Sequence, residues 1–109
     1  MVYSKPLFIA LQNRVREAFQ RHLKASYGVE PHIVIEQPSR PEFGELALTF
    51  AFELAKTLRR PPRKIAEEVA KTLPPIPGVA RLEPAGAGYV NVFFDRTAFA
   101  ASQIGRAHV

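Results

Sequence analysis

The chain contains no cysteine. This absence excludes disulfide bonds, thiolate nucleophiles and zinc sites built on cysteine, and it fits a reducing compartment such as the cytoplasm. No apolar stretch approaches the roughly 20 residues that span a bilayer. The first segment mixes apolar residues with Gln12, Arg14 and Glu17, which is not the pattern of a secretory signal peptide. We therefore expect a cytoplasmic location and no membrane partner.

Residues arranged for catalysis or metal binding are also missing from the sequence. The histidines His22, His32 and His108 lie far apart, with no carboxylate or cysteine at ligand spacing. Glu67 and Glu68 are adjacent, so on a helix their side chains point about 100° apart and do not form a catalytic pair. No serine lies in a nucleophile-elbow motif. We predict no catalytic residue, no metal site and no cofactor in this chain.

Acidic residues are fewer than basic ones. The 109 residues include 15 Lys and Arg against 10 Asp and Glu, a formal net charge of +5. Such a balance favours polyanion partners, because each cation placed near a phosphate releases condensed counterions. A solvated basic surface without a partner explains the same charge. The hydrophobic fraction of 47% is that of a globular protein, and the length predicts a single domain over residues 1–109.

A long amphipathic helix is predicted at the start of the chain. Ser4 is a suitable N-cap and Gly28 offers a stop. Between them, the side chains that recur on one face at helical spacing are Phe8, Leu11, Val15, Phe19 and His22. This pattern indicates a helix that covers one side of a sheet.

The middle of the sequence predicts one strand and two helices. The β-branched run His32–Gln37 predicts the strand, and residues 38–44 follow as a stiff loop. Apolar residues are dense over Glu45–Leu58, which indicates a well-buried helix. Pro61 interrupts this helix, and Pro62 is suited to the first position of another.

Two strands and a short helix complete the predicted fold. Val79–Pro84 and Tyr89–Phe94 are the strands, joined by a reversal over Ala85–Gly88. Asp95 is a suitable cap for a last helix over Arg96–Ile104. The order α-β-α-α-β-β-α predicts an α+β fold, a two-layer domain in which helices cover a small, mainly antiparallel sheet.

The strand Tyr89–Phe94 has an unusual outer face. Side chains alternate along a strand, so Val90, Val92 and Phe94 are expected to face the core. Tyr89, Asn91 and Phe93 then share the other face. An aromatic ring beside an amide suits a single-stranded nucleotide, since the ring stacks on a base and the amide reads its edge. Alternatively, Asn91 bonds a neighbouring loop and Tyr89 covers the edge of the sheet.

The densest group of cations lies between the two central helices. It comprises Arg59, Arg60, Arg63 and Lys64. A rigid, proline-containing elbow would hold these cations ready for phosphate contacts. A solvated turn between helices is the other interpretation, and the sequence alone leaves both open.

Several stretches of the sequence form a recognisable set: Pro41–Ala47, Ala51–Lys56, Pro62–Glu68, Ala85–Phe94, and Asp95–Arg96 with Ala98–Phe99. Together they resemble one family, the N-terminal additional domain of bacterial arginyl-tRNA synthetases. They cover nearly the whole chain in the order that the family shows. The resemblance therefore implies a tRNA-binding domain from a larger ligase.

The resemblance also implies partners and site residues. In the family this domain contacts the D-loop at the outer corner of the tRNA, and the family's tyrosine and asparagine match Tyr89 and Asn91. The intact enzyme attaches arginine to its tRNA with ATP and Mg²⁺, in a catalytic domain marked by H-x-G-H and K-M-S-K-like motifs. Neither motif occurs in these 109 residues. We expect this chain to be the N-terminal part of such an enzyme, with the catalytic domain of the same protein as a partner and no activity of its own.

The same residues also support a second hypothesis for the function. Tyr89 and Phe93 on an exposed strand face would also make a docking patch for another protein. The chain would then be a stand-alone interaction domain. The steep salt dependence of RNA binding distinguishes the two hypotheses.

Overall fold

The computed structural model describes residues 5–95 of the chain. The helices are α1 (Lys5–Tyr27), α2 (Phe50–Leu58) and α3 (Pro62–Thr72), with a 3-10 turn η1 (Pro41–Phe43). The strands are β1 (Ile35–Glu36), β2 (Leu46–Leu48), β3 (Val79–Ala85) and β4 (Tyr89–Phe94). They form one sheet in the order β1-β2-β4-β3, with each neighbouring pair antiparallel. The expected α+β fold is confirmed, while Ser4 and the expected helix Arg96–Ile104 lie outside the described residues.

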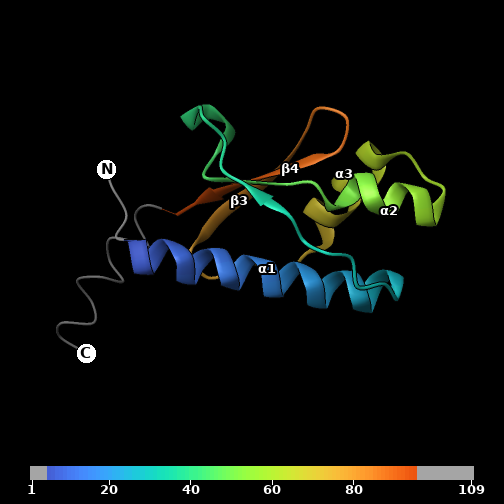
Figure 1. Cartoon of the computed structure of the whole chain (residues 1–109), viewed down its shortest axis with the longest axis horizontal. Helices are drawn as coiled ribbons and strands as arrows, with labels where there is room; N and C mark the ends of the chain where they lie inside the picture. The colour runs from blue at the N-terminus through green and yellow to red at the C-terminus, as the bar shows by residue number, and fades with distance from the viewer. Residues whose placement is uncertain (1–4, 96–109) are drawn as a thin grey trace.

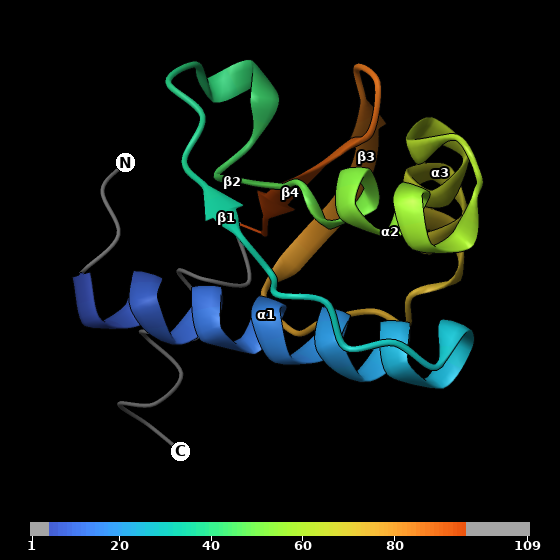
Figure 2. The same cartoon turned by 45° about the vertical axis from the view of Figure 1, so that its right-hand side comes forward.

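The helix α1 and the sheet form two layers, and the two shorter helices lie at one end of the sheet. The long helix α1 runs along one side of the sheet, and η1 and the turn between β3 and β4 project from the opposite side (Figure 1). Helices α2 and α3 lie together at the end of the sheet near the C-terminal half of α1, as both views show (Figure 2). The face of the sheet away from α1 is therefore bordered by a projecting turn at either side.

The core lies between α1, the sheet and the two shorter helices. The buried side chains of α1 are Leu11, Val15, Phe19 and Leu23. Phe19 packs on Phe50 of α2, with ring centroids 5.4 Å apart. The expected stripe is confirmed up to Phe19, but Leu23 takes the buried position that we assigned to His22. The His22 ring instead lies at the margin, with Nε2 2.9 Å from the hydroxyl of Thr72.

The segment Glu45–Leu58 is not one helix, as we expected. Its first part, Leu46–Leu48, is strand β2 in the interior of the sheet, and α2 begins only at Phe50. Both neighbouring strands pair with β2, and all of its side chains are buried. A strand buried on both faces reads as a continuous apolar run, which periodicity does not distinguish from a buried helix. The observed order through residue 95 is therefore α-β-β-α-α-β-β.

The first strand is shorter than the expected His32–Gln37. Only Ile35 and Glu36 pair with β2, opposite Leu48 and Ala47. Because β2 has only three residues, it provides few backbone partners for hydrogen bonds. The rest of the expected strand therefore does not pair. The break between the two shorter helices is confirmed. Arg59 ends α2 in a left-handed conformation, with φ 55°, and Pro62 begins α3.

Candidate nucleic-acid interface

An open hollow lies on the face of the sheet away from α1. Its volume is about 330 Å³, within the range of about 300–1,000 Å³ typical of small-ligand pockets. We call it the sheet hollow. Its lining residues are Glu36, Pro38, Phe43, Ala47, Ala85, Gly86, Tyr89 and Asn91. The structure thus brings together Tyr89 and Asn91, which the sequence indicated as site residues.

Strand register explains the floor of the sheet hollow. Glu36 pairs with Ala47, and Ala47 pairs with Asn91, so one row of side chains crosses β1, β2 and β4. Residues paired in this way share a face of the sheet. Ala47, in the middle of the row, has only a methyl group and leaves space above it. Tyr89 stands two residues before Asn91 and lies on the same face.

Asn91 has an environment that is unusual for an asparagine. It is the only polar residue buried within residues 5–95, with 7% of its surface exposed. Its side chain makes no hydrogen bond to another residue in this part of the chain, although it lines the sheet hollow. No fully buried side-chain nitrogen or oxygen within residues 5–95 lacks a partner, so the Asn91 amide, which has no such bond, is not itself closed off from solvent. The amide is therefore available to a group that enters the hollow.

Tyr89 forms one wall of the sheet hollow. It is 38% exposed, and its ring packs on Phe52 of α2 with centroids 5.2 Å apart and planes at 75°. This edge-to-face geometry is a favoured one for aromatic pairs. The ring is thereby supported from the side of α2 and remains accessible from the hollow.

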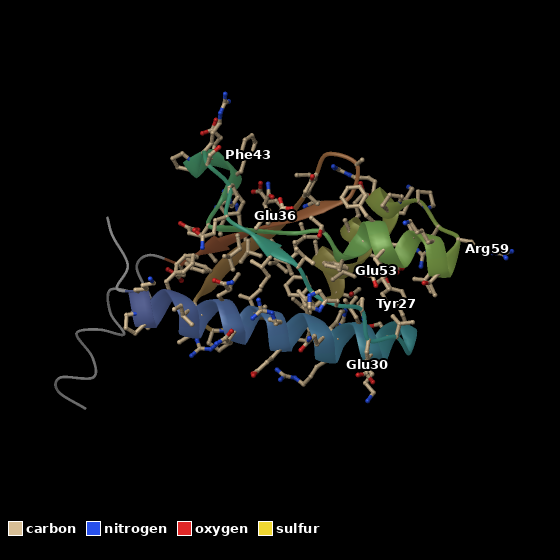
Figure 3. All side chains as sticks on the ribbon, viewed as in Figure 1. Tyr27, Glu30, Glu36, Phe43, Glu53 and Arg59 are labelled. Atoms are coloured by element: carbon tan, nitrogen blue, oxygen red, sulfur yellow. The ribbon has the colours of Figure 1, made fainter. Side chains whose placement is uncertain are left out.

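Among the lining residues that the sequence did not indicate as site residues, Phe43 and Glu36 have the side chains best suited to contact a ligand. Phe43, on η1, is 45% exposed, and Glu36 lies at the outer end of the cross-strand row. Figure 3 places both on the side of the sheet away from α1. Phe43 and Tyr89 stand far apart in the sequence and line one hollow. An aromatic residue within the stiff loop of residues 38–44 was the available signal for Phe43.

Phe93 is not exposed, contrary to our expectation. Only 9% of its surface is exposed, because the guanidinium of Arg81 lies over the ring, 3.8 Å from its centroid. Arg81 is itself held by an ion pair with Glu83. Phe93 also does not line the sheet hollow. The docking patch that we expected from Tyr89 and Phe93 is therefore reduced to Tyr89.

The expected basic cluster divides into paired and free cations. Arg60 forms an ion pair with Glu68 at 3.2 Å, and Arg63 forms one with Glu67 at 2.9 Å. Within residues 5–95, the side chains of Arg59 and Lys64 have no hydrogen bond or ion pair. Arg59 extends from the end of α2 away from the body of the domain (Figure 3). The free positive charge at this elbow thus belongs to Arg59 and Lys64.

Tyr27, Glu68 and Arg60 connect α1, α3 and the elbow. The hydroxyl of Tyr27 and the guanidinium of Arg60 both donate to Oε1 of Glu68. The hydrogen bond from Tyr27, followed by that from Arg60, lowers the pKa of Glu68. Burial, assisted by Glu68, raises the pKa of Tyr27 from 10.0 to about 12, while Arg60 opposes this shift.

We predict that Tyr27 ionises at a higher pH than an ordinary tyrosine. The pKa of Tyr27 is higher in the folded state, so its contribution to stability is complete below pH 10.0 and is lost as the pH rises through about 12. Near-ultraviolet absorbance should show a tyrosine that ionises near pH 12, and Tyr27→Phe should remove that step. Glu68→Gln should lower its midpoint only in part, because burial is the larger cause. If the absorbance change near pH 12 persists in Tyr27→Phe, the assignment to Tyr27 is wrong.

Neither a metal cluster nor a membrane span is found in the part of the chain that the structure describes. Residues 5–95 bring together no group of three or more His, Asp or Glu side chains able to hold a metal ion. No helix within this range has both the length and the apolar character needed to cross a membrane.

Comparison with known proteins identifies the family. The model of the arginyl tRNA synthetase N-terminal domain matches residues 10–94. An arginine–tRNA ligase of Thermotoga maritima is 40% identical over 83 residues, which are 76% of this chain and 15% of that protein. One of Thermococcus sibiricus is 43% identical over 72 residues, 64% of this chain and 11% of that protein.

A solved structure agrees with the sequence relatives. The arginyl-tRNA synthetase of Thermus thermophilus matches with a TM-score of 0.69 and 30% identity, over 79% of this chain and 14% of that one. The chain spans about 15% of the length of the first relative. Sequence and fold lead to the same conclusion: the chain belongs to the family of arginyl-tRNA synthetase N-terminal domains.

Proposed function

We propose that this chain is the tRNA-contacting domain of an arginine–tRNA ligase and that its sheet hollow receives one unstacked nucleotide of the tRNA D-loop. The observation that carries the proposal is Asn91, a largely buried residue whose amide stays accessible and has no hydrogen-bond partner within residues 5–95, at the lining of an open hollow. A free amide can donate to and accept from the edge of a base.

The walls of the sheet hollow supply the remaining contacts. The exposed ring of Tyr89 would stack on the base, and Phe43 borders the same hollow from η1. Arg59 and Lys64 at the elbow would contact phosphates without giving up an ion pair, whereas Arg60 and Arg63 would first have to leave Glu68 and Glu67. Aromatic stacking combined with nearby cations is the usual arrangement for single-stranded nucleic acid.

The proposal places this domain within a larger cytoplasmic enzyme. The catalytic domain of the same protein would attach arginine to the tRNA held here, and ATP and Mg²⁺ enter only as requirements of that whole ligase. The relatives are arginine–tRNA ligases of which this chain matches a small part. Binding at the outer corner of the tRNA would hold it in one orientation for the distant reaction.

The test is aminoacylation by the full-length enzyme of arginine tRNAs varied singly through the D-loop. Asn91→Ala should reduce discrimination at one position, because the amide that reads the base edge is lost. Tyr89→Ala should weaken all variants at that position, by about 1–3 kcal/mol, because a ring stacks on any base. Ile9→Ala is the matched control, since Ile9 is 46% exposed on α1.

Melting of each variant separates recognition from folding. Asn91→Ala should melt near the wild-type temperature and Tyr89→Ala only slightly lower, since it loses the contact with Phe52. Val92→Ala, at a fully buried position, should melt clearly lower and keep wild-type discrimination. The proposal is wrong if Asn91→Ala melts the domain and no D-loop substitution distinguishes it from wild type.

Docking of another protein is the second candidate function. The exposed rings of Tyr89 and Phe43 beside the sheet hollow favour it. Salt dependence distinguishes the two candidates, because neutralised phosphates release counterions and apolar contacts do not. Binding to arginine tRNA that weakens steeply with salt supports the nucleic-acid function. Absence of binding at low salt would leave protein docking as the better explanation.

A further inference from the structure

The turn between β3 and β4 is fastened to the α2–α3 elbow. Nη1 of Arg63 donates to the carbonyl oxygen of Gly86 at 3.0 Å. Nε of the same guanidinium donates to Oε2 of Glu67 at 2.9 Å. Glu67 stands one helical turn further along α3, so it holds the guanidinium in place from the helix side. One side chain thus connects a helix to the turn that leads into β4.

Packing at Gly88 fixes the same turn a second time. A Cβ atom placed on Gly88 would lie 2.7 Å from Cβ of Pro62 and 3.2 Å from the ring of Phe52. The backbone here approaches the elbow as closely as a residue without a side chain permits. The next residue is Tyr89, whose ring rests edge-on against Phe52. Contacts from the elbow and from Phe52 of α2 therefore meet at the turn immediately before the ring that forms a wall of the sheet hollow.

From these contacts, we propose that Arg63 is a positioning residue that fixes the Tyr89 ring at the wall of the sheet hollow, and not a phosphate ligand. Both of its nitrogen contacts lie within the domain, on Glu67 and on Gly86. The proposal rests on the proposed function for what the ring then does, which is to stack on a base. It assigns Arg63 and its neighbour Lys64 to different tasks, although both are cations of the same elbow.

Lys64 provides a matched control for this distinction. It stands next to Arg63 on α3, it is exposed, and its side chain has no hydrogen bond or ion pair within residues 5–95. A free cation on the surface acts through charge alone. Removal of Lys64 should therefore change the salt dependence of binding, while removal of Arg63 should change the geometry of the hollow.

The first measurement needs no RNA. In Arg63→Met, the ring proton resonances of Tyr89 should shift, because the turn loses one of its two attachments and the ring can then move relative to Phe52. In Lys64→Met they should keep their wild-type positions. A Tyr89 spectrum that is unchanged in Arg63→Met would overturn the proposal, and melting of both variants shows whether the domain has kept its fold.

The second measurement is a double-mutant cycle on RNA binding. Affinity for an RNA hairpin with the D-loop sequence of an arginine tRNA would be measured at several salt concentrations. Arg63→Met should weaken binding roughly threefold to tenfold with the salt slope unchanged, and should have no further effect in a Tyr89→Ala background. Lys64→Met should lower the slope by roughly 0.7–1 and should act additively with Tyr89→Ala.

The outcomes distinguish failure of this inference from failure of the proposed function. If Tyr89→Ala itself leaves affinity unchanged, or the hairpin does not bind, the proposed nucleotide site is wrong. If Tyr89→Ala weakens binding but Arg63→Met adds to it fully and lowers the salt slope, Arg63 contacts phosphate and the positioning role is wrong. Coupling between the two residues, seen as no added effect of Arg63→Met in the Tyr89→Ala background, together with an unchanged salt slope supports the role proposed here.

Discussion

Replacing Gly44 with alanine is expected to lower the free energy of unfolding by about 2–5 kcal/mol, through backbone strain and overpacking together. Gly44 has φ 84° and ψ −168°, a region that is accessible essentially to glycine alone. A Cβ atom there would lie 2.5 Å from the carbonyl oxygen of Val92. That oxygen accepts the hydrogen bond from the backbone of Glu45 beside β2. The clash therefore acts on the pairing of the two central strands.

Gly28 is the matched control for this prediction. It also has a positive φ, 69°, but a Cβ atom would meet nothing within 4 Å. Gly28→Ala should cost only the left-handed strain of about 1–2 kcal/mol. Urea unfolding of both variants measures the difference. Equal losses in the two variants would show that contact with Val92 contributes nothing.

A second large effect is expected in the core. Phe19→Ala should lower the free energy of unfolding by about 3–5 kcal/mol, a large part of the roughly 5–15 kcal/mol that stabilises a domain. Phe19 is fully buried, and its ring packs on Phe50 at 5.4 Å. The substitution removes an aromatic contact between α1 and α2, and the cavity lies among the buried residues of the core.

Chemical denaturation compared with Phe19→Leu tests this second prediction. Leucine keeps most of the apolar volume, so its loss should be clearly smaller than that of alanine. A free energy of unfolding within about 1 kcal/mol of wild type for Phe19→Ala would mean that the site collapses around the cavity, against expectation.

The elements that could be predicted from the sequence carry their own local signals. Helix α1 repeats Leu11, Val15 and Phe19 at helical spacing and ends beside Gly28. Pro62 begins α3, as its position after the break indicates. These signals depend on near neighbours in the chain, so the sequence is enough to read them.

The parts that were missed depend on partners distant in the sequence. Strand β2 lies between β1 and β4 with its side chains buried, so its sequence is a continuous apolar run. That run has no alternation that would mark it as a strand. Phe93 was expected on an exposed face, and only the fold shows Arg81 lying over its ring. Phe43 reaches the sheet hollow because pairing of β2 with β4 brings its loop beside Tyr89. The pair Tyr89 and Asn91 could be selected because both lie on one strand, but its assignment to RNA stays a prediction.

The short first strand also bears on self-association. Strand β1 forms one border of the sheet, and unpaired backbone groups at such a border invite another chain to add a strand. Only Ile35 and Glu36 adopt strand structure there, between Pro31 and Pro38, which have no backbone N–H to donate. At the other border, β3 contains Pro84 and shifts register between Val79 and Arg81. Each border thus offers an incoming strand an interrupted ladder, a device that natural sheets use against aggregation.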